Sequence, residues 1–280
     1  MKKVVFSLLM LVSLVSCVTR SIEFDSVKTL ESWYIETAGM GGSTYWNPIA
    51  YPLPEPAGIT VSRLTLDEAT DIDFYFPSEH NSKSRSPVIV TPRIFKRFDE
   101  FNLFNRGILT MDYEISWAHL LASQGWVVVK YESERPNTAL EEIIGFVAEN
   151  EKALGVNGNN IALWTISSNP KGVLSFLASP DSDNSKRITC AAFFSPDLKI
   201  SAPYSFSDLH HVPYFIAIGL KDDKSMNTRA LNFAKKCEES GLDYEFYEHP
   251  SGGHGFDALT PDEKTIEIID ACLDFFEKYL

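Results

Sequence analysis

The sequence predicts an α/β protein with a mainly parallel, twisted sheet of about eight strands and helices on both faces. From residue 59 onward, short β-rich segments alternate with helical segments, an order typical of parallel sheets. The connections between them are short, as crossover units require. A chain of 280 residues, 44% of them hydrophobic, is long enough to bury a sizeable core. The predicted strands cover residues 59–65, 71–76, 87–91, 126–131, 160–164, 189–194, 213–218 and 243–248.

Helical periodicity between the strands supports this arrangement. Segment 137–154 carries Leu140, Ile143, Ile144 and Val147 at positions i, i+3, i+4 and i+7, and the last predicted helix repeats the spacing. Each helix therefore has one apolar face to bury on a sheet. The first two strands are joined by a short turn, which predicts an antiparallel hairpin at one edge. The predicted helices cover residues 113–123, 137–154, 169–179, 226–240 and 262–279.

The first residues have the pattern of an export signal. Two lysines precede an apolar run over residues 4–15 that is too short to span a bilayer comfortably. The run ends in the letters LVSC, which resemble the lipobox of bacterial lipoproteins. The resemblance implies that Cys17 becomes a lipidated N-terminus and anchors an exported protein to a membrane of the bacterial cell envelope. A plain signal peptide with an incidental cysteine is the alternative.

These features divide the chain into three parts. Residues 1–16 are predicted to be the lipoprotein signal peptide. Residues 17–57, rich in aromatic residues and proline, are predicted to form a lipid-anchored tether and an irregular extension. Residues 58–280 are predicted to form the α/β domain.

Charge and cysteine content exclude several classes of function. The formal charge of -13 repels the phosphates of nucleic acids, so we expect no nucleic-acid partner. Cys190, Cys237 and Cys272 show no CxxC pair and no metal-ligand spacing, so we expect neither a metal nor another cofactor. Cys190 and Cys272 lie in apolar patterns and are predicted to be buried thiols. One disulfide among the three cysteines is the alternative in an oxidising compartment.

Three side chains that follow predicted strands have the types that nucleophilic catalysis needs. Ser167 follows strand 160–164, where a nucleophile elbow would place a serine, and Asp222 and His254 follow two later strands. Catalytic groups collect at the carboxyl ends of the strands in an open α/β sheet, so we expect the three to meet. A histidine oriented by a carboxylate can remove the proton of a serine hydroxyl. The set predicts Ser167 as nucleophile, His254 as base and Asp222 as acid.

Residues 71–279 resemble the dienelactone-hydrolase-like esterase branch of the α/β-hydrolases. The resemblance rests on the segments SWAHLLASQGWVVVKYESERP, LGVNGNNIALWTISSN, GLKDD and HPSGGHGF, and on the chain order serine, acid, histidine. It implies an α/β-hydrolase fold and a serine esterase in which Ser167, Asp222 and His254 form the catalytic triad. The neighbouring Asp223 is an alternative acid.

The turn around the serine departs from the GxSxG pattern. Thr165 and Asn169 occupy the positions that are normally glycine or another small residue, although some members of the branch carry an asparagine at the second. The departures motivate a second hypothesis, a surface lipoprotein that keeps the hydrolase fold for a binding role with weak or no catalysis.

An oxyanion formed on the substrate would need two backbone N–H donors. The N–H of Ser168 is predicted to be one of them. The other should come from the loop after strand 87–91, where Pro92 has no N–H, so Arg93 or Ile94 would donate.

The expected substrate is a small-molecule ester. About eighteen residues separate the strand ending near 194 from the strand starting at 213, too few for a long helical cap. An open site favours small or soluble acyl esters, hydrolysed through an acyl-enzyme. A serine peptidase or an acyltransferase would use the same three residues and stays an alternative.

Overall fold

The computed structural model describes residues 22–39, 48–80, 87–90, 112–179, 182–200, 205–209 and 212–280. The predicted signal peptide, Cys17 and Arg93 lie outside the described residues. None of the helices within these ranges combines the length and the apolar composition that crossing a bilayer requires.

The described strands form one nine-stranded sheet in the order β1-β2-β3-β5-β4-β6-β7-β8-β9. Neighbouring strands are parallel from β5 to β9 in this order. The pairings β1 with β2, β2 with β3 and β3 with β5 are antiparallel. The six parallel strands therefore all end at one edge of the sheet. The strands are β1 (Ser26–Thr29), β2 (Thr60–Asp67), β3 (Thr70–Phe76), β4 (Pro87–Val90), β5 (Val127–Ser133), β6 (Ile161–Ile166), β7 (Ile188–Phe194), β8 (Tyr214–Gly219) and β9 (Tyr244–His249).

The sheet differs from the prediction at its antiparallel end. Each of the eight predicted strands is present, but β1 is an additional strand, and three pairings are antiparallel where we expected one hairpin. The four residues of β1 include a single apolar side chain, Val27, which is 62% exposed. No hydrophobic pattern therefore marks β1, and its place comes from pairing with β2, in which Val27 lies opposite Ser62.

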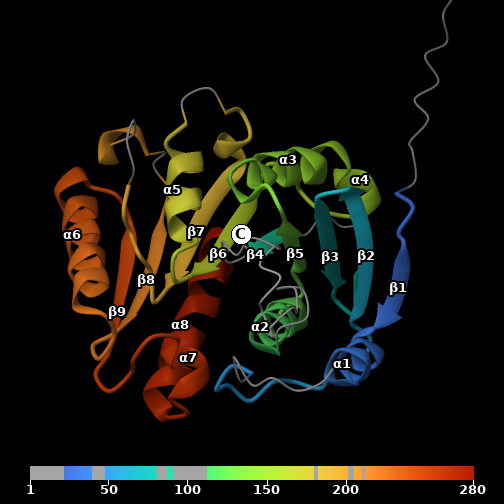
Figure 1. The fold of residues 1–280 in the computed structure, drawn as a ribbon, viewed down its shortest axis with the longest axis horizontal. Coiled ribbons are helices and arrows are strands. Elements are labelled where there is room, and N and C mark those ends of the chain that lie inside the picture. The colour runs from blue at the N-terminus through green and yellow to red at the C-terminus, as the bar shows by residue number, and fades with distance from the viewer. Residues whose placement is uncertain are drawn as a thin grey trace, which may run out of the picture.

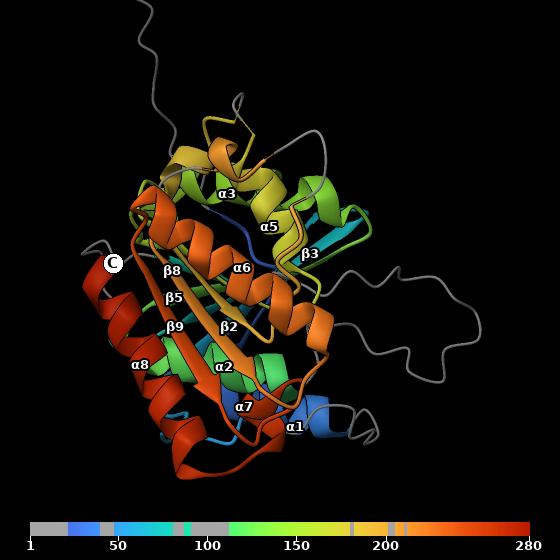
Figure 2. The same ribbon diagram turned by 90° about the vertical axis from the view of Figure 1, so that its left-hand side faces the viewer.

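Helices cover both faces of the sheet (Figure 1, Figure 2). α3 and α5 lie over one face, and the buried side chains of α6 belong to the same core. α2 and α8 cover the opposite face. The helices are α1 (Leu30–Gly39), α2 (Asp112–Ser123), α3 (Pro136–Glu149), α4 (Glu151–Leu154), α5 (Pro170–Leu177), α6 (Lys224–Ser240), α7 (Phe256–Leu259) and α8 (Glu263–Tyr279), with short 3-10 helices η2 (Ser185–Arg187) and η3 (Phe206–Asp208).

One predicted helix is divided in the structure. We expected a single helix over residues 137–154, but α3 ends before Asn150 and α4 follows it. The side-chain amide of Asn150 donates a hydrogen bond to the carbonyl of Phe146 (2.8 Å). The same carbonyl also accepts the backbone N–H of Asn150 (3.1 Å), and the helix is interrupted at Asn150 because its φ of −108° departs from the helical value.

Each face of the sheet packs against its own apolar core, and the two cores hold the strands in register. On the α3 side, the four positions predicted from periodicity are all buried, namely Leu140, Ile143, Ile144 and Val147. On the α2 side, the ring of Trp117 lies 4.8 Å from that of Trp164 and 5.0 Å from that of Phe194. Aromatic contacts of this kind contribute about 0.5–1.5 kcal/mol each beyond area burial. Strands β6 and β7 are thereby fixed just before the loops that follow them.

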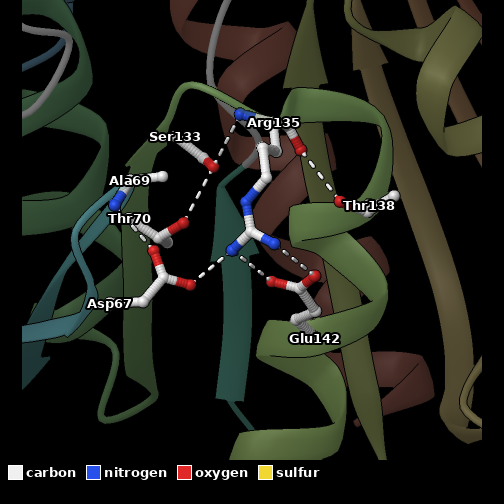
Figure 3. A network of polar contacts seen from close by, with 7 residues as sticks. All are labelled: Asp67, Ala69, Thr70, Ser133, Arg135, Thr138 and Glu142. Carbon is white, nitrogen blue, oxygen red and sulfur yellow. Dashed lines mark hydrogen bonds and ion pairs between the residues drawn. The ribbon is translucent and has the colours of Figure 1, made fainter.

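A polar network joins the β2–β3 turn to the junction between β5 and α3 (Figure 3). The guanidinium of Arg135 forms ion pairs with Asp67 at the end of β2 and with Glu142 of α3. The hydroxyl of Ser133, at the end of β5, lies 2.8 Å from that of Thr70 and accepts a hydrogen bond from the N–H of Arg135 (3.0 Å). The antiparallel end of the sheet is thus tied to α3, the helix that follows β5.

The described part of the segment before residue 58 packs on the domain, and it contains regular elements where we expected an irregular extension. Its described part contains β1 and α1, and the Trp33 ring of α1 lies 4.7 Å from the Arg63 guanidinium of β2. Farther along, the N–H of Ile49 donates to the hydroxyl of Ser116 in α2 (3.0 Å), and the hydroxyl of Tyr51 donates to Asp270 of α8 (2.6 Å). From Leu30 onward, the described part of the extension therefore covers the α2 side of the sheet.

Candidate active site

Ser167 occupies a strained turn between the end of β6 and the start of α5. Its φ is +63°, a left-handed conformation that costs a residue other than glycine about 1–3 kcal/mol. The turn begins immediately after the last residue of β6 and gives way to Pro170, the first residue of α5. It therefore projects the serine side chain, which is half-buried, from the carboxyl edge of the sheet.

The residues that depart from the GxSxG pattern do not prevent this turn. Thr165 is fully buried as part of β6, and Asn169 is 3% exposed just before Pro170. The N–H of Asn169 donates to the carbonyl of Ile166, which closes the turn around Ser167. The strained serine is thus compatible with the larger flanking side chains.

The loop after β8 separates the roles of the two neighbouring aspartates. The carboxylate of Asp223 caps α6 by accepting hydrogen bonds from the N–H groups of Ser225 and Met226. Hydrogen bonds from the Ser225 hydroxyl and from these N–H groups lower the pKa of Asp223. The carboxylate of Asp222 instead faces His254 and has a side chain only 5% exposed. Of the two candidate acids, only Asp222 contacts the histidine.

The loop after β9 carries His254 close to the end of β8. A Cβ added to Gly219 would lie 2.4 Å from the carbonyl oxygen of Gly252 and 2.5 Å from that of Gly253. A glycine is therefore needed where these two loops cross. The N–H of Lys221 also donates to the Gly252 carbonyl (2.8 Å), which joins the loop of Asp222 to the loop of His254.

The structure brings the three predicted side chains into one hydrogen-bonded line. Nε2 of His254 lies 2.9 Å from the Oγ of Ser167, and Nδ1 of His254 lies 2.9 Å from Oδ2 of Asp222. In the tautomer that satisfies both contacts, Nδ1–H donates to Asp222, and Nε2 accepts from the serine hydroxyl. This arrangement can remove a proton from Ser167 and stabilise the resulting imidazolium.

One of the two predicted oxyanion donors lies within the described chain. The N–H of Ser168 lies directly after the candidate nucleophile Ser167, and no atom of the described residues accepts a hydrogen bond from it. A backbone N–H left free next to a nucleophile is available to an anionic oxygen. Arg93 and Ile94, the candidates for the second donor, lie outside the described ranges.

Two other histidines, His119 and His249, have hydrogen-bond partners away from this site. Nδ1 of His119 lies 3.1 Å from the hydroxyl of Tyr34, and the buried His249 pairs with Asp262 at 2.9 Å. Among the residues that the structure describes, no three His, Cys, Asp or Glu side chains are grouped as metal ligands. Cys190, Cys237 and Cys272 are buried free thiols.

Comparisons with known proteins identify the fold. No family model and no curated protein matches the sequence. Among solved structures, an α/β-hydrolase enzyme from a Medee basin deep-sea metagenome library aligns with a TM-score of 0.59 at 15% identity, covering 79% of this chain and 98% of that one. Esterase 2 of Thermogutta terrifontis, phosphorylated by paraoxon, aligns with a TM-score of 0.60 at 16% identity, covering 80% and 95%. The same esterase with bound butyrate has a TM-score of 0.57 at 17% identity.

The chain has the α/β-hydrolase fold. At 15–16% identity, the similarity to these solved structures concerns the architecture alone. In this chain, the nine described strands include the parallel set from β5 to β9. Within this fold, Ser167, Asp222 and His254 stand on the loops after β6, β8 and β9, at the common carboxyl edge.

Sequence reasoning missed a group of polar residues next to the turn of Ser167 in this α/β-hydrolase fold. Asp197, which follows β7, forms ion pairs with Lys171 of α5 and Arg229 of α6, each at 2.5 Å. Burial would raise the pKa of Asp197, but hydrogen bonds and charges from the two cations outweigh this effect and lower it. The only signal in the sequence was the run Ser-Pro-Asp directly after a predicted strand. It did not reveal the ion pairs, because their partners lie on other elements.

Proposed function

We propose that this protein is a serine hydrolase, and specifically a carboxylesterase that acts on small or soluble acyl esters. The observation that carries the proposal is the hydrogen-bonded line from Ser167 through His254 to Asp222, with both contacts at 2.9 Å. The α/β-hydrolase fold and its hydrolase and esterase neighbours support the same class of reaction, since this fold commonly presents such a set at the carboxyl edge of its sheet.

In the proposed reaction, the Oγ of Ser167 attacks the ester carbonyl while Nε2 of His254 takes the serine proton. Asp222 holds the imidazole in position and stabilises its positive charge. The N–H of Ser168 donates to the oxyanion of the tetrahedral intermediate. The carbon–oxygen bond to the alcohol then breaks, the alcohol takes the proton from His254, and the acyl group remains on Ser167. Water, activated by His254, releases the acid and restores the serine.

The proposed preference for small or soluble esters is supported by the connection between β7 and β8. In the described part of this connection, only η3 (Phe206–Asp208) is helical. Lipases that act on apolar lipid substrates cover their sites with longer helical segments, so a short connection favours substrates that need no large apolar cover.

Labelling with a fluorophosphonate probe tests the proposal without knowledge of the natural ester. We expect the purified chain to be labelled and Ser167→Ala and His254→Ala to lose labelling. The matched control is Ser240→Ala, which changes an exposed serine at the end of α6 and should label like the wild type. Paraoxon is a second reagent, because it phosphorylates the fold neighbour esterase 2. A folded wild-type chain that reacts with neither reagent would contradict the proposal and favour a binding role.

We also propose that Cys17 is lipidated and holds the exported protein at a membrane of the bacterial cell envelope. The support is the apolar run over residues 4–15 and the letters LVSC that end it. Wild-type protein expressed in bacteria should incorporate labelled palmitate and stay in the membrane fraction. Cys17→Ser should do neither. Equal incorporation in the two proteins would contradict lipidation at this residue.

A further inference from the structure

The turn after β7 contains a second strained serine. Ser195 has a φ of +42°, and Ser195 and Ser167 are the two residues other than glycine with positive φ in the described ranges. Ser195 is 2% exposed, and Asp197, two residues later, is 9% exposed. We call residues 195–197 the β7 turn. A strained conformation persists when the contacts around it hold it in place, so these contacts indicate what the turn does.

The β7 turn and the residue before it bind both backbone polar groups of the nucleophile. The N–H of Ser167 donates to the carbonyl of Phe194 (3.1 Å), and the N–H of Asp197 donates to the carbonyl of Ser167 (2.6 Å). These two hydrogen bonds fix the peptide groups on either side of the strained Ser167. Rotation of the nucleophile turn would break at least one of them.

The same turn also holds the loops of the base and the acid. The hydroxyl of Ser195 accepts a hydrogen bond from the N–H of Gly255, the residue after His254, at 3.1 Å. Gly255 is buried, so its N–H depends on a partner within the protein. The N–H of Ser195 donates to the carbonyl of Ala217 (2.8 Å), two residues before the last residue of β8, from which the loop to Asp222 leads.

The carboxylate of Asp197 connects the two helices that follow the nucleophile and the acid. Lys171 lies in the first turn of α5, which starts three residues after Ser167. Arg229 lies in α6, which starts two residues after Asp222. Both cations share one carboxylate, so a shift of either helix would weaken an ion pair. Partly buried ion pairs of this kind resist such shifts more than exposed ones do.

We propose that the β7 turn is a positioning element for the hydrolase reaction, in which Ser195 and Asp197 hold the loops of Ser167, His254 and Asp222 in register. This inference rests on the proposed function. Neither side chain lies in the hydrogen-bonded line of the three proposed catalytic residues, so both act through the residues they hold. Loss of either should slow the attack by Ser167 without changing the recognition of a reagent.

Ser195→Gly separates positioning from support of the fold. Glycine adopts positive φ without strain, so this change relieves the backbone while removing the acceptor for the Gly255 N–H. We expect the maximal rate constant of fluorophosphonate labelling to fall roughly 10- to 100-fold, because small misplacements of reacting groups slow reactions by this order. The probe concentration at half-maximal rate and the melting temperature should stay close to the wild-type values. A purely structural role would leave the labelling rate unchanged when the melting temperature is unchanged.

Asp197→Asn tests the second residue of the turn, and Asp183→Asn is its matched control. Asp183 forms an ion pair with Lys186 before β7, at the opposite edge of the sheet, and its side chain is 87% exposed. We expect slower labelling for Asp197→Asn and wild-type labelling for the control. Wild-type labelling rates in both Ser195→Gly and Asp197→Asn would overturn this inference and leave the proposed function standing. A wild-type chain that does not label would overturn the proposed function and this inference with it.

Discussion

The Oγ of Ser167 and Nε2 of His254 lie 2.9 Å apart, although 87 residues separate them in the sequence. Ser167 reaches this position because the chain turns with positive φ after β6. His254 reaches it because the loop after β9 crosses the end of β8 at Gly219 without a side chain in the way. The contact therefore depends on two backbone features rather than on the two side chains alone.

If Ser167 and His254 act as one unit, their replacements should not be additive. We expect Ser167→Ala and His254→Ala each to reduce ester hydrolysis by roughly 10⁴- to 10⁶-fold, because either change leaves no activated nucleophile. The double variant should be no slower than the slower single variant. Hydrolysis of a chromogenic short-chain ester under single-turnover conditions measures all three. A double variant slower by the product of the two single effects would show that the residues act independently.

The two aspartates after β8 give a matched pair of variants. Asp222→Ala should reduce hydrolysis by roughly 10⁴-fold, since His254 would lose the carboxylate that orients it. Asp223→Ala removes the cap of α6 instead, so we expect a slightly lower melting temperature and nearly unchanged hydrolysis. Kinetics and thermal unfolding of both variants decide the assignment. The reverse pattern of rates would make Asp223 the acid.

Much of the fold could be predicted because its helices and strands follow from the local periodicity of apolar residues. The apolar residues that begin β5 and the helical spacing of Leu140 and Ile143 each reflect burial on a sheet, and both are visible without any partner. β1 could not be predicted in this way, because Val27 is exposed and the strand exists through its pairing with β2. The break at Asn150 was missed because the apolar spacing continues across it.

The site was predictable where it follows strand ends and unpredictable where it depends on contacts between loops. Ser167 and His254 could be proposed from the order of strands and residue types alone. The choice between Asp222 and Asp223 could not, because adjacent side chains differ only in direction, which the start of α6 decides. Asp197 had no motif, since its partners come from α5 and α6.

The crossing of the two loops at Gly219 should not tolerate a methyl group. In Gly219→Ala the new Cβ would meet two backbone oxygens, which cannot move aside as a flexible side chain could. We expect a loss of about 1–3 kcal/mol in the free energy of unfolding and a roughly 10- to 100-fold slower hydrolysis. Gly172→Ala in α5 is the control, because its Cβ would meet nothing within 4 Å, and it should stabilise by about 0.4–1 kcal/mol. Denaturant unfolding and ester hydrolysis test both. A wild-type rate in Gly219→Ala would contradict the expected displacement of His254.

The ion pairs of Asp197 should make stability depend on pH in a defined direction. The neighbouring cations Lys171 and Arg229 lower the pKa of this carboxyl below its ordinary value of 3.8 in the folded protein. The folded state therefore binds this proton less readily than the unfolded chain. The resulting stabilisation is complete above the ordinary pKa and is lost as the pH falls through the lower folded pKa.

Comparison of the wild type with Asp197→Asn isolates this contribution, since asparagine does not titrate. The wild type should be more stable than the variant at pH 7, and the difference should shrink as the pH falls below about 4. The exposed Asp183→Asn change should give a smaller difference at pH 7, because solvent screens that pair with Lys186. Denaturant unfolding of the three proteins at pH 7 and pH 3 measures both effects. If the difference in stability between the wild type and Asp197→Asn grows toward pH 3, the folded state raises the pKa of Asp197. The ion pairs with Lys171 and Arg229 would then not be what holds α5 and α6 to the β7 turn.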